Sequence, residues 1–467
     1  SMRKLHLLPV LALAVTAPAA DEAPTTLDPV TVRGATAEWA IPADIRATMG
    51  SDLAPSNLPF ASERFDSHLT LRRGNDTLRD VLSNSAGAVT GLGNGVHDFF
   101  VVRGIDSLTG ALVLYDGLPE PEATIYPTYN IDAVEILRGS GSFLHGAGAM
   151  AGSANIVRKQ AGWDDLTQLH LSIGEHNAYE GRLDVNRSSD SVALRSVTGY
   201  GDRESHRDGI ESSWFGETLT STWQLNEGLT LKAFVEYVDY EIVPDAGVPV
   251  LGPEVITRDR GASFSQAGDI SEQQVFRFGA DLLANWGEWQ FRNRLWVTQL
   301  EWDSTGTILA GYPLLATAPP GLDTLVLARL SATLDDKQLL VGDRMEWTRT
   351  LEHDAYTHEV LVGVEALRLT DEFTLSFSPA SSINTLTGAE APPLVPPIPA
   401  NTGDATVDRI SAFAYDQISR GGAHVFVGAR VDYIDFEDDA RGTERNDTVF
   451  SPIIGASLNI AGPWTVF

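Results

Sequence analysis

The sequence contains no cysteine among its 467 residues. This absence excludes a disulfide framework and every metal site that is built on thiolates. Basic residues are scarce as well, because 33 Lys and Arg stand against 63 Asp and Glu, for a formal net charge of -30. Without a basic surface to neutralise phosphates, nucleic acid is excluded as a partner. The acidic surface either keeps the protein soluble outside a membrane or binds divalent cations among anionic lipids.

Long apolar runs are also missing, and no window approaches the roughly 20 apolar residues of a membrane-spanning helix. That absence leaves a transmembrane β-barrel open, because barrel strands alternate apolar and polar residues and their hydropathy averages out. The chain is too long for one small domain and long enough for two.

Enzyme motifs are absent too. The sequence has no phosphate-binding glycine-rich loop, no His-Glu-x-x-His and no Gly-x-Ser-x-Gly. The pair His358-Glu359 lies in a strand-like pattern without a second histidine at helical spacing. We therefore predict no enzyme activity, no catalytic residue, no intrinsic cofactor and no resident metal. The acidic run Asp435–Asp439 either binds calcium or forms a solvated hairpin tip.

The N-terminus has the pattern of a secretory signal peptide. Arg3 and Lys4 form a positive region, Leu5–Val15 is a short apolar stretch, and small residues up to Ala20 resemble a cleavage site. We therefore predict export, with residues 1–20 as the signal peptide. Residues 21–50 are rich in Pro, Ala and Thr and predict a flexible segment.

Residues 51–162 predict an α+β domain. Thr77–Leu82 reads as a short capped helix. Phe99–Gly104 and Leu112–Gly117 read as strands that end in Arg-Gly and Asp-Gly turns, and Asn130–Gly139 reads as a further strand.

Residues 163–467 change to long strands in which apolar and polar residues alternate. The polar set that includes Lys232, Glu236, Arg277 and Asp281 is predicted to face a wet lumen or a domain inside it. Tight turns are expected at 187–191 and 285–288, and long linkers at 241–271, 304–335 and 372–405. Aromatic residues at strand ends would suit membrane interfaces; these are Tyr240, Trp286, Trp289 and Trp302. A soluble β-sandwich is the alternative, but it seldom needs so many strands beyond ten residues.

One stretch carries a family resemblance. Asn130–Gly139, then Ser142–Gly146, Gly148, Gly152 and Asn155–Val157, resembles the plug of TonB-dependent outer-membrane receptors of the siderophore-receptor type. The resemblance extends over nearly the whole chain and is most specific for residues 77–159. It implies a mainly β fold, with an N-terminal α+β plug domain (51–162) followed by an antiparallel transmembrane barrel (163–467). About 12 candidate strands follow the plug, against the 22 of plugged transporters, so we predict a partial barrel and a C-terminally truncated chain.

The resemblance also implies a function. It predicts import of a ferric siderophore or a similar metal chelate across an outer membrane, with haem, cobalamin and saccharides left open as other cargoes. The implied partners are outer-membrane lipid, the chelate, and TonB with its inner-membrane motor. Leu27–Val32 resembles the TonB box, an extended segment that pairs with a partner strand, and its core is Asp28, Pro29, Val30, Thr31 and Val32. A passive porin or an adhesin is the rival class, and a porin would lack both the box and the plug.

Site residues follow from the same resemblance. Arg103, Glu135 and Arg138 match positions whose charges lock the plug to the barrel wall. Ligand contacts are expected from outward plug loops, with His97, Thr109, Tyr126 and Tyr129 as candidates, since aromatic rings suit the apolar and catecholate parts of a chelate. No Arg or Lys lies between residues 103 and 138, which argues against a strongly anionic chelate unless loops holding Arg203, Arg207 and Arg258 compensate.

Overall fold

The computed structural model describes residues 61–93, 95–107, 111–121, 124–139, 141, 145–146, 149, 152–251, 253–257, 259–311, 326–461 and 464–466. All of them belong to one compact unit, Pro42–Phe467. The predicted signal peptide, the TonB box and Thr109 lie outside the described residues.

Residues 61–158, here called the plug domain, contain a five-stranded sheet. Its order is β1 (Ala61–Asp66), β7 (Ile131–Arg138), β8 (Gly152–Arg158), β5 (Ala111–Tyr115) and β6 (Leu118–Pro119). β5 and β8 are parallel, and the other pairs are antiparallel. A second sheet consists of β2 (Ala88–Gly93), β3 (His97–Val102) and β4 (Ile105–Asp106). The plug domain therefore has both strand pairings of an α+β fold.

One short helix packs against the five-stranded sheet, and a second packs against the sheet of β2, β3 and β4. Helix α2 (Ser67–Arg73) begins after Asp66, whose carboxylate accepts from the Leu69 N–H at 2.7 Å. Helix α3 (Leu78–Leu82) begins at Thr77, which forms a capping box with Asp80. The predicted helix is thus confirmed. Its buried residues pack into the plug core with side chains from both sheets, namely Leu78, Val81, Leu82, Phe100, Val102, Val113, Val134 and Ile156.

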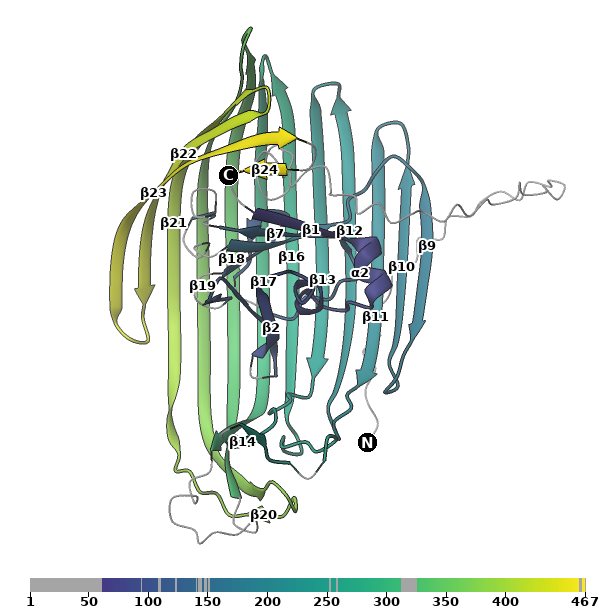
Figure 1. The fold of residues 1–467 in the computed structure, drawn as a ribbon, viewed down its shortest axis with the longest axis vertical. Coiled ribbons are helices and arrows are strands. Elements are labelled where there is room, and N and C mark those ends of the chain that lie inside the picture. Colours follow the sequence, from purple (N-terminus) through teal and green to yellow (C-terminus); the bar gives the residue numbers. More distant parts are fainter. Residues whose placement is uncertain are drawn as a thin grey trace, which may run out of the picture. The chain divides into compact units, whose positions relative to one another are not determined.

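All but two of the remaining strands form one antiparallel sheet, here called the wall, in which strands that are neighbours in sequence pair in order (Figure 1). Its longer strands are β9 (Leu166–Ile173), β10 (Tyr179–Ser188), β11 (Val192–Glu204), β12 (Glu211–Asn226), β13 (Leu229–Ile242), β16 (Ile270–Trp286), β17 (Trp289–Gly311), β18 (Val326–Glu352), β19 (Thr357–Asn384), β21 (Ile398–Arg420), β22 (Ala423–Asp438) and β23 (Thr443–Ala461). The short strands β20 (Glu390–Ala391) and β24 (Trp464–Val466) complete it. The predicted mainly β fold, an α+β domain followed by a large antiparallel sheet, is confirmed.

Strand lengths differ from the sequence prediction in one respect. The tight turn at 285–288 is present, since Trp286 pairs with Trp289. The linker at 241–271 is also present and contains the hairpin of β14 (Val250–Leu251) and β15 (Glu254–Val255). The linkers predicted at 304–335 and 372–405 are much shorter, because strands β17, β18, β19 and β21 extend into them. The linker prediction depended on the Pro, Gly and Thr content of these segments, but apolar and polar residues still alternate at 328–334 on β18 and at 372–378 on β19.

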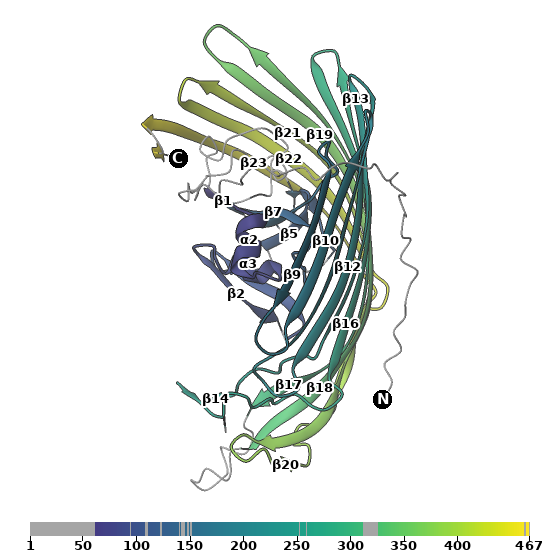
Figure 2. The same ribbon diagram turned by 90° about the vertical axis from the view of Figure 1, so that its right-hand side faces the viewer.

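The wall has two different faces. Large apolar side chains are exposed on its outer face, such as Phe276 and Leu295, each about two-fifths exposed. Inward positions of the same strands, such as Arg277 and Arg294, are buried. Figure 2 shows the reason, because the plug domain lies against the concave face of the wall. An apolar outer face and a polar inner face are what a lipid-embedded barrel wall requires.

In the part of the chain that the structure describes, no helix has the length and apolarity needed to cross a membrane.

Candidate functional site

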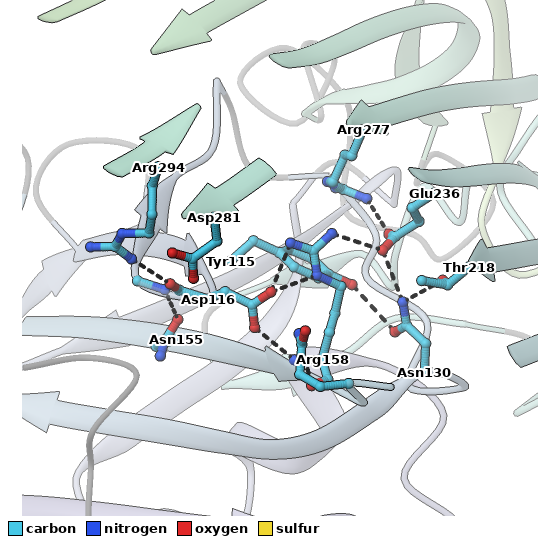
Figure 3. A network of polar contacts seen from close by, with 12 residues as sticks. Tyr115, Asp116, Asn130, Asn155, Arg158, Thr218, Glu236, Arg277, Asp281 and Arg294 are labelled. Carbon is cyan, nitrogen blue, oxygen red and sulfur yellow. Dashed lines mark hydrogen bonds and ion pairs between the residues drawn. The ribbon is translucent and has the colours of Figure 1, made fainter. Parts of the chain in front are cut away.

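A buried polar network joins the plug domain to the wall (Figure 3). At its centre lies Glu236 on β13, which is 1% exposed. The Glu236 carboxylate accepts hydrogen bonds of 2.9 Å from the Asn130 amide and 2.7 Å from Arg277. The Arg158 guanidinium lies 3.5 Å from the same carboxylate. Because Asn130 and Arg158 belong to the plug domain and Arg277 belongs to the wall, one carboxylate holds both parts.

Each arginine of this network is paired with a second acid. Arg158 lies 2.7 Å from Asp116, and Arg277 lies 2.6 Å from Glu120. Both guanidinium groups also lie within 5 Å of the centre of the Tyr115 ring, at cation–π distance. Burial of a charge costs several kcal/mol unless the charge is paired. The pairing here satisfies that condition on both sides of the contact.

A second polar cluster of the wall faces the plug turn at His145 and Gly146. It consists of Arg344, Glu346, Glu365, Arg409, Arg430 and Asp432, all of them buried. Gly146 has a φ of 76°, and a Cβ there would lie 3.0 Å from the Asp432 carboxylate, so glycine permits the close approach. Burial, together with the neighbouring Arg344, lowers the pKa of His145 to about 3. This histidine therefore meets the wall as a neutral ring.

Two predicted ligand residues lie in packing contacts. Tyr129 is fully buried, and its hydroxyl lies 2.7 Å from the Thr218 hydroxyl of the wall. Tyr126 is 2% exposed and belongs to the plug core. Both rings are covered by the plug and the wall, so the expectation that they present aromatic surface to a ligand is corrected. Their described role is to position the plug.

A cavity of about 410 Å³ lies where the plug loop between β2 and β3 meets the wall. From the plug it is lined by Val96 and by His97, the one predicted ligand residue among its lining residues. From the wall come the aromatic rings of Trp302, Phe373 and Phe377. The cavity volume falls within the range of small-molecule sites. Trp302, which was predicted to lie at a membrane interface, instead faces inward.

His97 contributes a neutral ring to this cavity. Its ring lies edge-on to Trp302, with centroids 6.0 Å apart. Burial lowers the pKa of His97, and neither ring nitrogen has a hydrogen-bond partner. The Trp302 N–H donates to the Ser271 hydroxyl at 2.9 Å. The imidazole nitrogens therefore keep their capacity to bind a ligand, whereas the indole N–H is already satisfied.

The polar lining of the cavity is acidic and amidic. Besides the hydroxyls of Ser304 and Thr307, it comprises Asp336, Gln338, Asp371 and Asn401. The Gln338 amide donates to Asp336 at 2.9 Å, and a side-chain hydrogen bond links Asp336 with Asp371. Among the described residues that line the cavity, none is Arg or Lys. The cavity thus combines aromatic surface with a negative charge.

Directly behind His97, the plug loops are tied to the wall. The Gln273 side chain of β16 donates to the Val96 carbonyl at 2.7 Å and accepts from the Ile125 N–H at 3.1 Å. Asp98 is fully buried and accepts from the Tyr126 N–H at 3.3 Å, while its other oxygen has no hydrogen-bond partner. Burial raises the pKa of Asp98 to about 7. A ligand that moves His97 would therefore act on Gln273 and Asp98 as well.

Comparison with known proteins accounts for this arrangement. Residues 55–153 match the family model described as TonB-dependent Receptor Plug Domain. The match covers most of the plug domain that the wall encloses. The chain therefore contains the plug domain of a TonB-dependent receptor.

Relatives of the receptor are named for siderophores. The catecholate siderophore receptor Fiu of Escherichia coli K12 is 25% identical over 324 residues, which are 64% of this chain and 42% of Fiu. The siderophore receptor PiuA of Acinetobacter baumannii has a solved structure with a TM-score of 0.76 at 16% identity, covering 88% of this chain and 64% of PiuA. The pyoverdine receptor FpvA of Pseudomonas aeruginosa gives 0.77 at 18% identity, covering 90% and 63%. These structures show the shared fold, and this chain spans less than half the length of the sequence relatives that it matches.

The charges that the sequence predicted as a lock have partners inside the receptor's plug. Glu135 lies 2.6 Å from Arg64, and Arg138 pairs with Glu63, so both pairs join β1 to β7. Arg103 is exposed in a turn with a φ of 52°. The described ion pairs of Glu135 and Arg138 thus lie within the plug, and a lock between these charges and the wall stays a prediction.

Sequence reasoning missed the plug residues that do contact the wall, Arg158 and Asp116. The wall partners could be found, because Glu236 and Arg277 were placed on the inward face by strand alternation. Glu236 and Arg277 meet the plug because the tertiary fold places the end of β8 and the turn after β5 beside them. A single sequence carries no signal for that placement.

Proposed function

We propose that this receptor imports a ferric siderophore or a similar metal chelate across an outer membrane, with energy supplied through TonB. One observation carries the proposal: the plug residue His97 and the wall residue Trp302 line the same cavity. A ligand in this cavity contacts both parts of the receptor at once. The names of the relatives support a siderophore as the cargo class.

Transport requires that ligand binding changes the plug. The loop that holds His97 is attached to the wall through Gln273, and it continues into Asp98, which binds the backbone of the Tyr126 segment. A ligand that favours a second position of this loop would shift the plug between two states, which is what coupling between two faces requires. The Glu236 network holds the plug against the wall, so the energy supplied through TonB would have to break this network.

The outer face of the wall supports an outer-membrane location. On β16 the outward residues from Phe276 to Trp286 are apolar or small, whereas the outward Glu272 precedes them. About 9–11 residues is the length with which a tilted strand crosses a bilayer. The apolar stretch therefore supports lipid contact along this part of the strand.

TonB would bind the predicted box at Leu27–Val32 by strand addition. Proline at Val30 removes a backbone donor from such a pairing and restricts the chain. Passive diffusion is the rival function, but buried plug–wall contacts oppose it. Haem, cobalamin and saccharides remain alternative cargoes of the same import reaction.

The test is uptake of radiolabelled iron by cells that express the receptor from its gene, over a panel of ferric chelates. We expect uptake of one chelate, and Val30→Pro should abolish uptake while leaving binding at the cell surface intact. Ala37→Pro, which changes the same segment outside the box, is the matched control and should transport normally. Absence of chelate binding in a surface-exposed receptor would refute the cargo, and normal uptake by Val30→Pro would refute the box.

A further inference from the structure

The cavity between His97 and the wall has a charge that constrains its ligand. Asp336 and Asp371 come from adjacent strands, and a hydrogen bond links their side chains. The pair carries one negative charge when it shares a proton and two when it does not. Asp336 is 4% exposed, so water screens this charge poorly.

A neighbouring arginine offsets only part of this charge. Arg441 stacks on the Phe373 ring at 5.6 Å and donates to the Asn401 amide at 2.9 Å. Its guanidinium lies 2.7 Å from Asp438, which is itself buried. This ion pair is close to neutral, so the acidic pair determines the sign of the charge in the cavity.

A second observation shows that the cavity has unmet hydrogen-bonding capacity. His97 is 6% exposed, and both of its ring nitrogens lack a hydrogen-bond partner. One Asp371 oxygen is likewise buried without a partner. A neutral imidazole and a carboxylate together offer mainly acceptors. The matching ligand therefore presents N–H or O–H donors and an apolar or aromatic body for Trp302 and Phe373.

We infer that the cavity selects a metal chelate of zero or positive net charge that presents hydrogen-bond donors such as an ammonium group, and that it discriminates against polyanionic chelates. The inference depends on the proposed function and gives its cargo a chemical class. Iron(III) bound by three catecholate dianions carries three negative charges, whereas iron(III) bound by three hydroxamates is neutral. The acidic pair would repel the first and accept the second, even though a relative of the receptor is named for catecholates.

Binding to the purified receptor tests the charge preference directly. The probes are a trianionic ferric tris-catecholate, a neutral ferric tris-hydroxamate and a ferric tris-hydroxamate with a free ammonium group, each titrated by calorimetry. A unit charge near one carboxylate changes Kd by roughly tenfold to thirtyfold. We therefore expect the cationic chelate to bind at least about tenfold more tightly than the trianion.

The double variant Asp336→Asn/Asp371→Asn removes the charge at nearly constant volume. It should reduce the preference for the cation by about tenfold or more. The matched control is Asp335→Asn/Glu372→Gln, because these residues neighbour the pair in sequence and are exposed on the outer face. This control changes the net charge equally and should leave the preference unchanged.

The outcomes separate the inference from the proposed function. Tighter binding of the trianion than of the cation, or an equal loss of preference in the control, would overturn the inference while import stands. If no ferric chelate binds, the proposed import of siderophores is refuted. The charge preference of the cavity is then tested with two naphthalene probes of equal size. Preference for the ammonium-bearing probe over the sulfonate-bearing one, lost in the double variant, would support the inference, and no such preference would overturn it.

Discussion

Glu236 offers the sharpest test of how the plug is held. Replacement by alanine removes a carboxylate that binds Asn130, Arg277 and Arg158 at 2.9, 2.7 and 3.5 Å. Arg158 and Arg277 stay buried in the variant, because the plug and the wall cover them. Each keeps one acid partner, Asp116 or Glu120. The substitution therefore leaves each cation with one acid partner and removes the hydrogen bonds that Glu236 accepts from Asn130 and Arg277.

The expected cost follows from these contacts. A hydrogen bond to a charged group contributes about 1.5–3 kcal/mol, so the loss of the two that Glu236 accepts should cost about 3–5 kcal/mol. Most of the cost falls on the contact between plug and wall, because the backbone pairing of β13 with β16 continues on both sides of the Glu236–Arg277 pair. Opening of the plug should then become roughly a hundredfold to several thousandfold more frequent.

Hydrogen exchange of the plug strands β7 and β8 measures this opening. We expect faster exchange there in Glu236→Ala and unchanged exchange in the wall strands. Glu241→Ala is the matched control, since Glu241 lies on the same strand outside the network and should leave plug exchange at the wild-type rate. Wild-type exchange of β7 and β8 in Glu236→Ala would refute the view that this network holds the plug.

Three further perturbations test other contacts of the plug. Burial raises the pKa of Asp98 to about 7 from its ordinary 3.8. The folded state therefore binds this proton more tightly than the unfolded state does. The stability that results is present below about pH 4 and is lost as the pH rises to about 7. The unfolding free energy of Asp98→Asn, followed by urea titration, should therefore rise relative to wild type by up to about 4 kcal/mol over that pH window, and a constant difference would contradict the assignment. Gln273→Ala removes two hydrogen bonds to the plug backbone and should cost about 1–3 kcal/mol of local stability at the Ile125 amide, measured by its exchange rate, whereas Gln274→Ala on the outer face should not. Arg138→Ala breaks a partly exposed pair and should cost about 1 kcal/mol or less. A loss of stability in urea unfolding as large as that of Glu236→Ala would support the predicted lock at Arg138.

Much of the fold could be predicted from local patterns. The capped helix at Thr77–Leu82 follows from side-chain to backbone hydrogen bonds within one turn, and the strand faces of β13 and β16 follow from a two-residue period. The ends of β17 and β19 were not predicted, because the Pro, Gly and Thr content of these segments is typical of linkers. Pairing with neighbouring strands maintains the extensions.

The candidate site was less predictable for a related reason. His97 was identified because it lies in an outward plug loop, and the structure places it in the cavity. Tyr126 and Tyr129 belong to the same region of sequence but are buried, since the loop folds back onto Thr218 and the plug core. Glu135 and Arg138 have the right charges for a lock but pair within one sheet.

The sequence by itself determined the class of the molecule: an acidic, cysteine-free chain with a plug-like domain followed by long alternating strands. These properties depend on composition and on contacts between residues that are close in the chain. Tertiary structure alone decided which charges join plug to wall and which residues line the cavity, because Glu236 and Asn130 are separated by 106 residues. Such a contact forms when two folded parts meet, and the strength of a buried charge depends on the partners that this meeting supplies.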